Sequence, residues 1–303
     1  MRSSERITVW MMSLFILLPG MGLLRAQQVV QFEDHLAKDR PEFWAAKLVA
    51  SEVLMTSMGV PDKTASGTLS LGIEAGWLPS LSPEQRLVGF NGTKEENLNR
   101  TPLFARPRVM VGLPHDFSVT AGYVPPIPIS GVKPNVLTLS VGRPVFSSSR
   151  ARLGLRLHGL VGRIKGDITC DADTVAAGQD PIRNPYGCEA VSADVMRLKA
   201  IGLETAGGLR FSKRMETHLA LGWNYFGSTF DVNARYSGLI DQTRLLGSGP
   251  AFSLAGGASY QVNPKARVSG EIFYTPLDVR RAGQPRKNDG LVNLRATLWY
   301  QLR

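Results

Sequence analysis

Apolar residues alternate with small or polar residues along most of the chain after Lys63. The segment 69–77, for example, reads LSLGIEAGW. The same period of two recurs at 153–161, 219–225, 252–260 and 292–300. Successive side chains of a β-strand point to opposite faces of a sheet, so this period predicts strands with one apolar and one small or polar face. The pattern predicts an all-β protein, and it is shared by soluble sandwiches and membrane barrels.

The connections between the strands help to separate these two architectures. We predict ten strands, at 66–78, 102–113, 116–124, 134–146, 150–167, 194–211, 215–234, 246–262, 265–281 and 290–303. Connections after the even-numbered strands are short, and those after the odd-numbered strands are longer. Outer-membrane barrels have this rhythm because one rim carries periplasmic turns and the other carries external loops. We therefore predict a closed antiparallel transmembrane β-barrel over 64–303, with both chain ends on the short-turn side.

The N-terminus has the layout of a secretory signal peptide. Arg2 and Arg6 precede a short apolar run at 9–18, and Ala26 offers a cleavage point before Gln27. The run is shorter than the ~20 residues that a membrane-spanning helix needs. We predict a signal peptide over 1–26, followed by export to the periplasm.

One helix is predicted between the signal peptide and the barrel. Within the segment 27–63, residues 41–58 form an apolar pattern that starts at Pro41 and stops before Gly59. We expect a short amphipathic helix here. Its role is open at this stage: it packs against a neighbour, lies at the membrane surface, or plugs or gates the barrel.

The alternation also predicts which polar residues face the lumen. These residues are Glu74, Arg106, Arg108, Arg152, Arg156, His158, Glu204, Arg210, Glu216, His218, Arg267, Glu271 and Arg295. Eight-stranded barrels are filled by side chains, and wide pores appear only at about sixteen strands. A ten-stranded lumen with this lining therefore predicts a salt-bridged, hydrated core, with a narrow anion-preferring path as the alternative.

The two cysteines and the charge add further expectations. Cys170 and Cys188 lie in a predicted loop at 168–193 and flank its segment rich in Asp, Gly, Pro and Asn, where a disulfide would stabilise the loop by about 3 kcal/mol. Their spacing does not suit a metal, and we predict neither a metal site nor a cofactor. The net charge of +10 points to anionic partners such as lipid phosphates, and no motif indicates nucleic-acid binding. Two outer segments remain ambiguous: the Pro-rich loop at 124–129 and the basic cluster at 280–287, which either binds lipopolysaccharide or is a solvated loop.

These features resemble those of bacterial outer-membrane β-barrel proteins as a class, over roughly 64–303. Aromatic residues on the predicted outward face near strand ends would form the interfacial girdle: Phe117, Tyr123, Phe211, Trp223, Tyr225, Tyr260, Tyr274 and Tyr300. The segment 291–303 (LVNLRATLWYQLR) resembles the terminal strand read by the barrel-assembly machinery, although it ends in Arg303 rather than an aromatic residue. A helix followed by a barrel is also similar to the fatty-acid transporter family, whose barrels are larger. The resemblance implies an outer-membrane location, with outer-membrane lipid and lipopolysaccharide as partners.

Catalysis is not expected. Omptin proteases are ten-stranded barrels with Asp and His residues at the external rim. This chain has His35, His115, His158 and His218, and the predicted topology leaves none of them at that rim.

Three functional hypotheses follow from the sequence. The first is a narrow or plugged conduit, or a binding site, for small anionic or amphipathic solutes. The second is a non-conducting structural or adhesive barrel that presents the disulfide-bound loop. The third is a soluble periplasmic β-protein.

Overall fold

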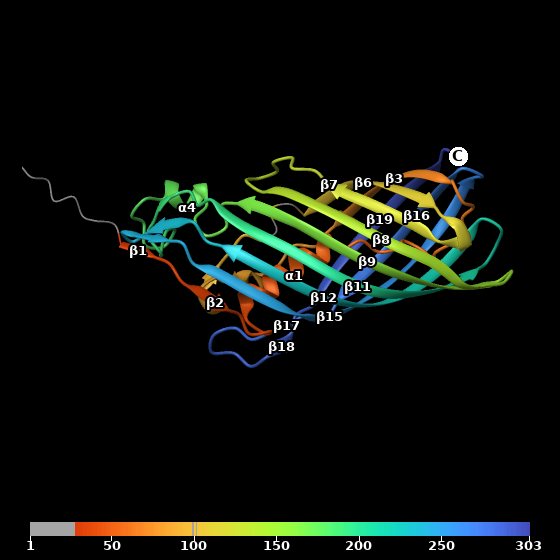
Figure 1. Cartoon of the computed structure of the whole chain (residues 1–303). Coiled ribbons are helices and arrows are strands. Elements are labelled where there is room, and N and C mark those ends of the chain that lie inside the picture. The colour runs from red at the N-terminus through yellow and green to blue at the C-terminus, as the bar shows by residue number, and fades with distance from the viewer. Residues whose placement is uncertain (1–27, 99, 101) are drawn as a thin grey trace, which may run out of the picture.

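Ten long antiparallel strands close on themselves into a barrel (Figure 1). This is a computed structural model, and it describes residues 28–98, 100 and 102–303. The barrel strands are β3 (Leu69–Trp77), β6 (Leu103–Gly112), β7 (Ser118–Val124), β8 (Lys133–Ser147), β9 (Ala151–Gly166), β11 (Asp194–Arg210), β12 (Met215–Asp231), β15 (Arg244–Asn263), β16 (Ala266–Thr275) and β19 (Leu291–Gln301). Each pairs with its neighbours along the chain, and β19 pairs with β3 to close the ring. The predicted all-β barrel of ten strands is confirmed, while the predicted signal peptide lies outside the described residues.

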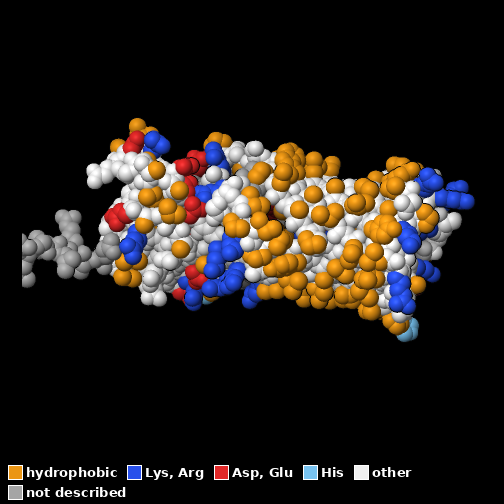
Figure 2. Space-filling model, turned by 90° about the horizontal axis from the view of Figure 1, so that it is seen from above, with side chains coloured by type: hydrophobic (Ala, Val, Ile, Leu, Met, Phe, Trp, Pro, Cys, Tyr) orange, Lys and Arg blue, Asp and Glu red, His pale blue; other side chains and the backbone are white. Residues whose placement is uncertain are grey.

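The outward face of the barrel is a continuous apolar surface. On β12, for example, Leu219, Leu221 and Trp223 are 56%, 61% and 47% exposed, while the alternate residues are buried. Figure 2 shows the hydrophobic side chains gathered over the strands on the face in view, and the same alternation on every barrel strand continues them into a belt. A soluble protein rarely exposes so large an apolar surface, whereas a lipid-facing barrel requires it. The belt therefore places this chain in the outer membrane, and it excludes the soluble periplasmic protein.

The connections differ at the two ends of the barrel, as the sequence predicts. Short turns at 113–117, 148–150, 211–214 and 264–265 form one end, and the first of them contains η1 (Pro114–Asp116). The long connections form the other end. They contain α2 (Pro83–Arg86), β4 (Leu87–Val88), α3 (Gly89–Gly92), β5 (Lys94–Glu95), α4 (Ala172–Ala176), β10 (Cys188–Ala190), β13 (Ala234–Tyr236), β14 (Leu239–Asp241), β17 (Asp278–Val279) and β18 (Lys287–Asn288). By the rule for such barrels, the short-turn end is periplasmic and the long-loop end is the outer end. No helix within the described residues is long and apolar enough to cross a membrane.

The chain reaches the barrel from an unexpected side. The strand β1 (Gln28–Val30) pairs with β14, and β2 (Glu33–His35) pairs with the first residues of β15. Both therefore lie at the outer end, far from the C-terminus (Figure 1). The prediction that both chain ends lie on the short-turn side is correct for the C-terminus and wrong for the described N-terminal end. The reason is that the segment before β3 threads through the barrel.

The helix α1 (Pro41–Glu52) is the first part of this threaded segment. It begins with Pro41 at its first turn, as expected, but ends at Glu52 rather than at residue 58. Nearly all of its residues are buried, including Lys47 and Ser51, so it lacks the exposed polar face of an amphipathic surface helix. Residues 53–63 continue without helix or strand, with positive φ at Met58 and Gly59, down the lumen to the short-turn end, where Asp62 meets Arg152. We refer to residues 53–63 as the plug.

Candidate functional site

Two arginines from the barrel wall cap the C-terminal end of α1. Arg295 donates to the carbonyl oxygens of Ser51 and Leu54 at 2.8 and 2.5 Å. Arg106 donates to the carbonyl oxygen of Val53 at 2.5 Å. The last carbonyls of a helix have no partner within the helix, and positive charge is favourable at this end. The wall therefore supplies the donors that a longer helix would have supplied, which explains why α1 stops early.

Two further arginines hold the plug below the helix. Arg108 donates to the carbonyl oxygen of Thr56 at 2.9 Å, and Arg156 donates to that of Met55 at 2.7 Å. Arg106, Arg108, Arg156 and Arg295 are 0–4% exposed, and we call them the arginine collar. Together they bind the backbone of residues 51–56 in the middle of the barrel.

Carboxylates on the wall balance the charge of the collar. Glu74 is fully buried and accepts two hydrogen bonds from Arg106, at 2.7 and 2.9 Å, and one from Arg108 at 3.0 Å. Glu204 accepts two from Arg156, at 3.1 and 2.7 Å. Such bidentate pairs make buried charge tolerable because each charge has a partner and well-aligned hydrogen bonds.

The lower part of the plug has its own contacts. The hydroxyl of Thr56 donates to Glu271, whose other oxygen lies 3.5 Å from Nε2 of His218. Near the short turns, Asp62 forms an ion pair with Arg152 at 2.6 Å.

The predicted lumen residues thus fall into groups. The collar arginines, Glu74, Glu204 and Glu271 surround the plug, and Arg152 and Arg210 meet its lower end. His158 lies on the wall, with Nε2 bonded to the side-chain oxygen of Asn224 at 2.7 Å. The alternation of the strands did not reveal the plug residues themselves. Thr56, Asp62 and the carbonyls of 51–56 lie in a segment without a period of two, so no sequence signal marked them.

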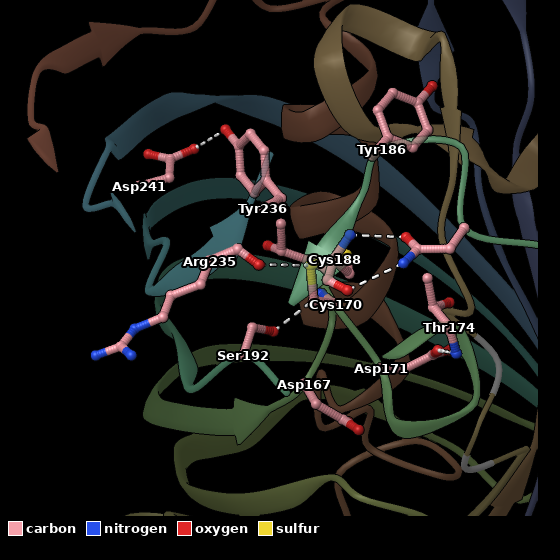
Figure 3. The surroundings of a disulfide bond; sticks show 12 residues. Asp167, Cys170, Asp171, Thr174, Tyr186, Cys188, Ser192, Arg235, Tyr236 and Asp241 are labelled. Carbon is pink, nitrogen blue, oxygen red and sulfur yellow. Dashed lines mark hydrogen bonds between the residues drawn. A yellow bond between two sulfur atoms is a disulfide. The ribbon is translucent and has the colours of Figure 1, made fainter. Parts of the chain in front are cut away.

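The loops at the outer end form a cap over the barrel. A disulfide joins Cys170 and Cys188, whose Cα atoms are 5.7 Å apart, as predicted (Figure 3). Asn184 accepts from the backbone N–H of Cys188 at 2.7 Å and donates to its carbonyl at 2.9 Å. The strand β10, which starts at Cys188, pairs with β13, which pairs with β14 and so with β1. The disulfide therefore anchors a small sheet that includes the start of the described chain.

Two cavities lie between this cap and α1. The larger, of about 390 Å³, is walled mainly by apolar side chains, including Ala45 and Ala46 of α1 and Phe230 of β12. The smaller, of about 210 Å³, is lined by Val49 of α1 and by Ile127 of the Pro-rich loop. The Pro-rich loop therefore faces α1 across this cavity.

Carboxylates outnumber cations in the larger cavity. Arg40 pairs with Glu42 at 3.0 Å and with Asp34 at 3.6 Å. Glu96, from the loop between β5 and β6, also lines the cavity, and its burial raises its pKa to about 8 although Lys94 lies 2.7 Å away. Burial thus favours the protonated form of this carboxyl group, while the ammonium group of Lys94, which donates to Glu96 at 2.7 Å, opposes the shift.

The basic side chains of the cluster at 280–287 form ion pairs with carboxylates of this same chain. Arg280 pairs with Asp39 and Arg281 with Asp289, at 3.2 and 3.0 Å. Arg286 and Lys287 pair with Asp278 and Glu84. The cluster therefore braces the outer loops, and this arrangement does not favour a dedicated lipopolysaccharide site.

One histidine does lie at the outer rim, contrary to the sequence-based topology. His35 is on β2, where the threading of the chain carries it to the outer end, and its Nε2 lies 3.4 Å from Glu33. Its side chain is 79% exposed, so the pair is solvated. In the lumen, Ser253 accepts from Asn224 rather than bonding to His158, so these residues form a polar relay without a nucleophile–base pair. Within the described residues, no group of three or more His, Cys, Asp or Glu could hold a metal ion.

The closed barrel, the apolar belt and the unequal rims define a bacterial outer-membrane β-barrel protein. No protein-family model matches the chain, and no curated protein matches it.

Solved structures of outer-membrane barrels resemble it in fold. The outer membrane protease OmpT from Escherichia coli is 13% identical, with a TM-score of 0.42, and the match covers 78% of this chain and 94% of OmpT. The COG4313 outer membrane channel from Pseudomonas putida F1 is 8% identical, with a TM-score of 0.40, covering 82% and 100%. The translocator domain of the autotransporter NalP from Neisseria meningitidis is 9% identical, with a TM-score of 0.40, covering 79% and 90%. These structures have different functions, and the likeness concerns the fold alone.

Proposed function

We propose that this protein is a plugged outer-membrane barrel, without catalytic activity, that binds a small amphipathic solute at its outer end. The observation that carries the proposal is the cavity of about 390 Å³ between the cap and α1. Ligand sites are concave and mostly apolar, with a few polar groups that orient the ligand. The charged side chains here, Asp34, Arg40, Glu42, Glu96 and Asp241, lie among walls that are mainly apolar.

The charge of the cavity narrows the choice of solute. Because Asp34 and Glu42 outnumber Arg40, an anionic head group would be repelled. A neutral or positively charged head on a short apolar chain suits this lining better. The solute therefore belongs to the amphipathic rather than the anionic class.

The plug supports a gated rather than an open conduit. All four collar guanidinium groups bind the backbone of residues 51–56, so they do not line a free anion path while the plug is in place. The helix α1 forms one wall of the cavity, and its C-terminal end is held by the collar. Solute binding in the cavity and the position of the plug are therefore linked through α1. Passage of a solute would require the plug to move.

Hexylamine and hexanoate are suitable probes because they differ only in the charge of the head group. Calorimetry on the refolded chain in uncharged amphipathic polymer should show saturable binding of hexylamine and much weaker binding of hexanoate. Ala46→Phe fills the cavity from α1 and should abolish the binding, whereas Ala282→Phe in an exposed loop should leave it unchanged. Equal binding by wild type and Ala46→Phe would place the solute elsewhere and refute the proposal.

The second candidate is an adhesive barrel that presents the disulfide-bound loop. The observation that favours it is Ile182, an apolar side chain in this loop that is 88% exposed. Loss of attachment by cells that carry Ile182→Ser, with hexylamine binding intact, would support this role. Assembly by the barrel-assembly machinery, contact with lipopolysaccharide and the oligomeric state stay predictions.

A further inference from the structure

A second charged cavity, of about 660 Å³, opens at the short-turn end of the barrel. Six cationic side chains line it, with two carboxylates, Asp62 and Glu216. The cations are Arg150, Arg152, Arg210, Lys213, Arg214 and Arg267. On the face seen in Figure 2, this end of the molecule shows Lys and Arg side chains without acidic ones.

The two carboxylates neutralise only part of this charge. Asp62 lies 2.6 Å from Arg152, and Glu216 pairs with Arg152 and lies 3.5 Å from Arg210. Both carboxylates therefore form their ion pairs with the same two arginines, and they attract Arg267 only from a longer distance. For the other four cations, no carboxylate of the described residues lies within ion-pair distance.

Among these four cations, Arg267 gives the strongest indication of an anion site. It lies at the start of β16, is half-buried and also lines a polar cavity of about 460 Å³ that reaches up to Arg108 and Arg156 of the collar. This cation has lost some of its water inside a partly enclosed mouth, and no carboxylate of the described residues lies within ion-pair distance to compensate fully, which is unfavourable. Low-dielectric walls also focus the positive potential on the mouth and attract anions to it. A bound anion would relieve the unfavourable charge at Arg267.

We propose that the short-turn mouth is a binding site for phosphate-type oxyanions, centred on Arg267 and flanked by Arg150 and Arg214. The planar guanidinium group presents paired donors that match phosphate oxygens, and several such groups line this mouth. Asp62, which belongs to the plug, provides a carboxylate at one edge of the site and competes with the bound anion. The phosphate is either a free ion or the head group of a phospholipid. This site is separate from the outer cavity and goes beyond the function proposed for it.

Pyrophosphate titrated calorimetrically into the refolded full chain tests the proposal. We expect saturable binding that Arg267→Gln weakens about tenfold, by the loss of one bidentate charge-assisted contact. Asp62→Asn removes the competing carboxylate and should strengthen binding about threefold. Arg143→Gln is the matched control, because Arg143 lies near the same rim but outside the cavity, over the ring of Phe117, and it should leave binding unchanged. The heat-resistant mobility of each variant on gels shows that the barrel has folded.

The same titration with dihexanoyl phosphatidylglycerol, and with the zwitterionic phosphatidylcholine analogue, identifies the source of the phosphate. Binding of either pyrophosphate or the anionic lipid, weakened by Arg267→Gln, supports the site. Absence of saturable binding for both ligands would overturn the proposal. Equal weakening by Arg143→Gln and Arg267→Gln would also overturn it, because it would indicate diffuse surface charge. Neither result depends on hexylamine binding at the outer end.

Discussion

Nη1 of Arg106 on β6 lies 2.5 Å from the carbonyl oxygen of Val53, the first residue after α1. The contact joins the barrel wall to the backbone of a segment that precedes the barrel in sequence. Because the wall donates to main-chain oxygens, these collar contacts do not depend on the side chains of the plug. The plugged state thus depends on arginines that the alternation of the strands directs inward.

Loss of one collar arginine should destabilise the folded barrel. Arg295→Gln removes the donors to the carbonyls of Ser51 and Leu54, which are buried. Unfolding in urea, followed by tryptophan fluorescence, should show a loss of about 3 kcal/mol. Arg280→Gln breaks an exposed ion pair with Asp39 and should cost less than about 1 kcal/mol. Equal effects of the two variants would mean that the collar does not hold the plug.

The same contacts should control conduction in planar bilayers. We expect the wild-type chain to be silent, because α1 and the plug occupy the lumen. Arg106→Gln combined with Arg295→Gln releases the carbonyls of 51–54 and should produce conductance steps that prefer anions, since Arg108 and Arg156 remain. A double variant that folds and stays silent would favour the non-conducting adhesive barrel.

The disulfide should stabilise the cap and not the barrel. Replacement of Cys170 and Cys188 by serine removes a cross-link with a sequence separation of 18 and should cost the cap about 3 kcal/mol. Limited proteolysis should then cut within 167–193, while the barrel keeps its heat-resistant gel mobility. If that mobility is lost as well, the cap and the barrel fold as one unit.

The cap should loosen as the pH rises. Burial raises the pKa of Glu96 from its ordinary value of 4.5 to about 8, so the folded cap favours the protonated carboxyl. The stabilisation is complete below pH 4.5 and is lost as the pH rises through 8. Hydrogen exchange of residues 78–98 should therefore be slower at pH 5 than at pH 9, after correction for intrinsic rates. Glu96→Gln should remove this difference; a difference that persists in the variant would assign it to another group.

The sequence predicted the barrel well because its signal is repeated ten times. Each strand needs a lipid-facing row such as Leu219, Leu221 and Trp223, and the period of two follows directly from that need. The inward direction of Arg106 and Arg295 follows from the same alternation. What these arginines bind could not be predicted, because backbone carbonyls carry no sequence signal.

The path of the N-terminal segment through the barrel could not be predicted from the sequence, for a different reason. The apolar pattern of 41–58 suits a helix inside a barrel as well as one on a membrane surface. Its true end at Glu52 is set by Arg106 and Arg295, which lie far away in the chain. The prediction that no histidine lies at the outer rim was wrong for the same reason, because this path carries His35 there.

Labelling of single cysteines on intact cells tests the threading most directly. Val29, 54% exposed on β1, should be at the cell surface, whereas Ser212 lies in a periplasmic turn. The native cysteines are joined in a disulfide and do not react. With a polyethylene-glycol maleimide too large to enter the periplasm, Val29→Cys should be labelled on intact cells and Ser212→Cys only after the outer membrane is permeabilised. If Val29→Cys also requires permeabilisation, the N-terminal segment does not pass through the lumen to the outer end, and the plugged-barrel account is contradicted.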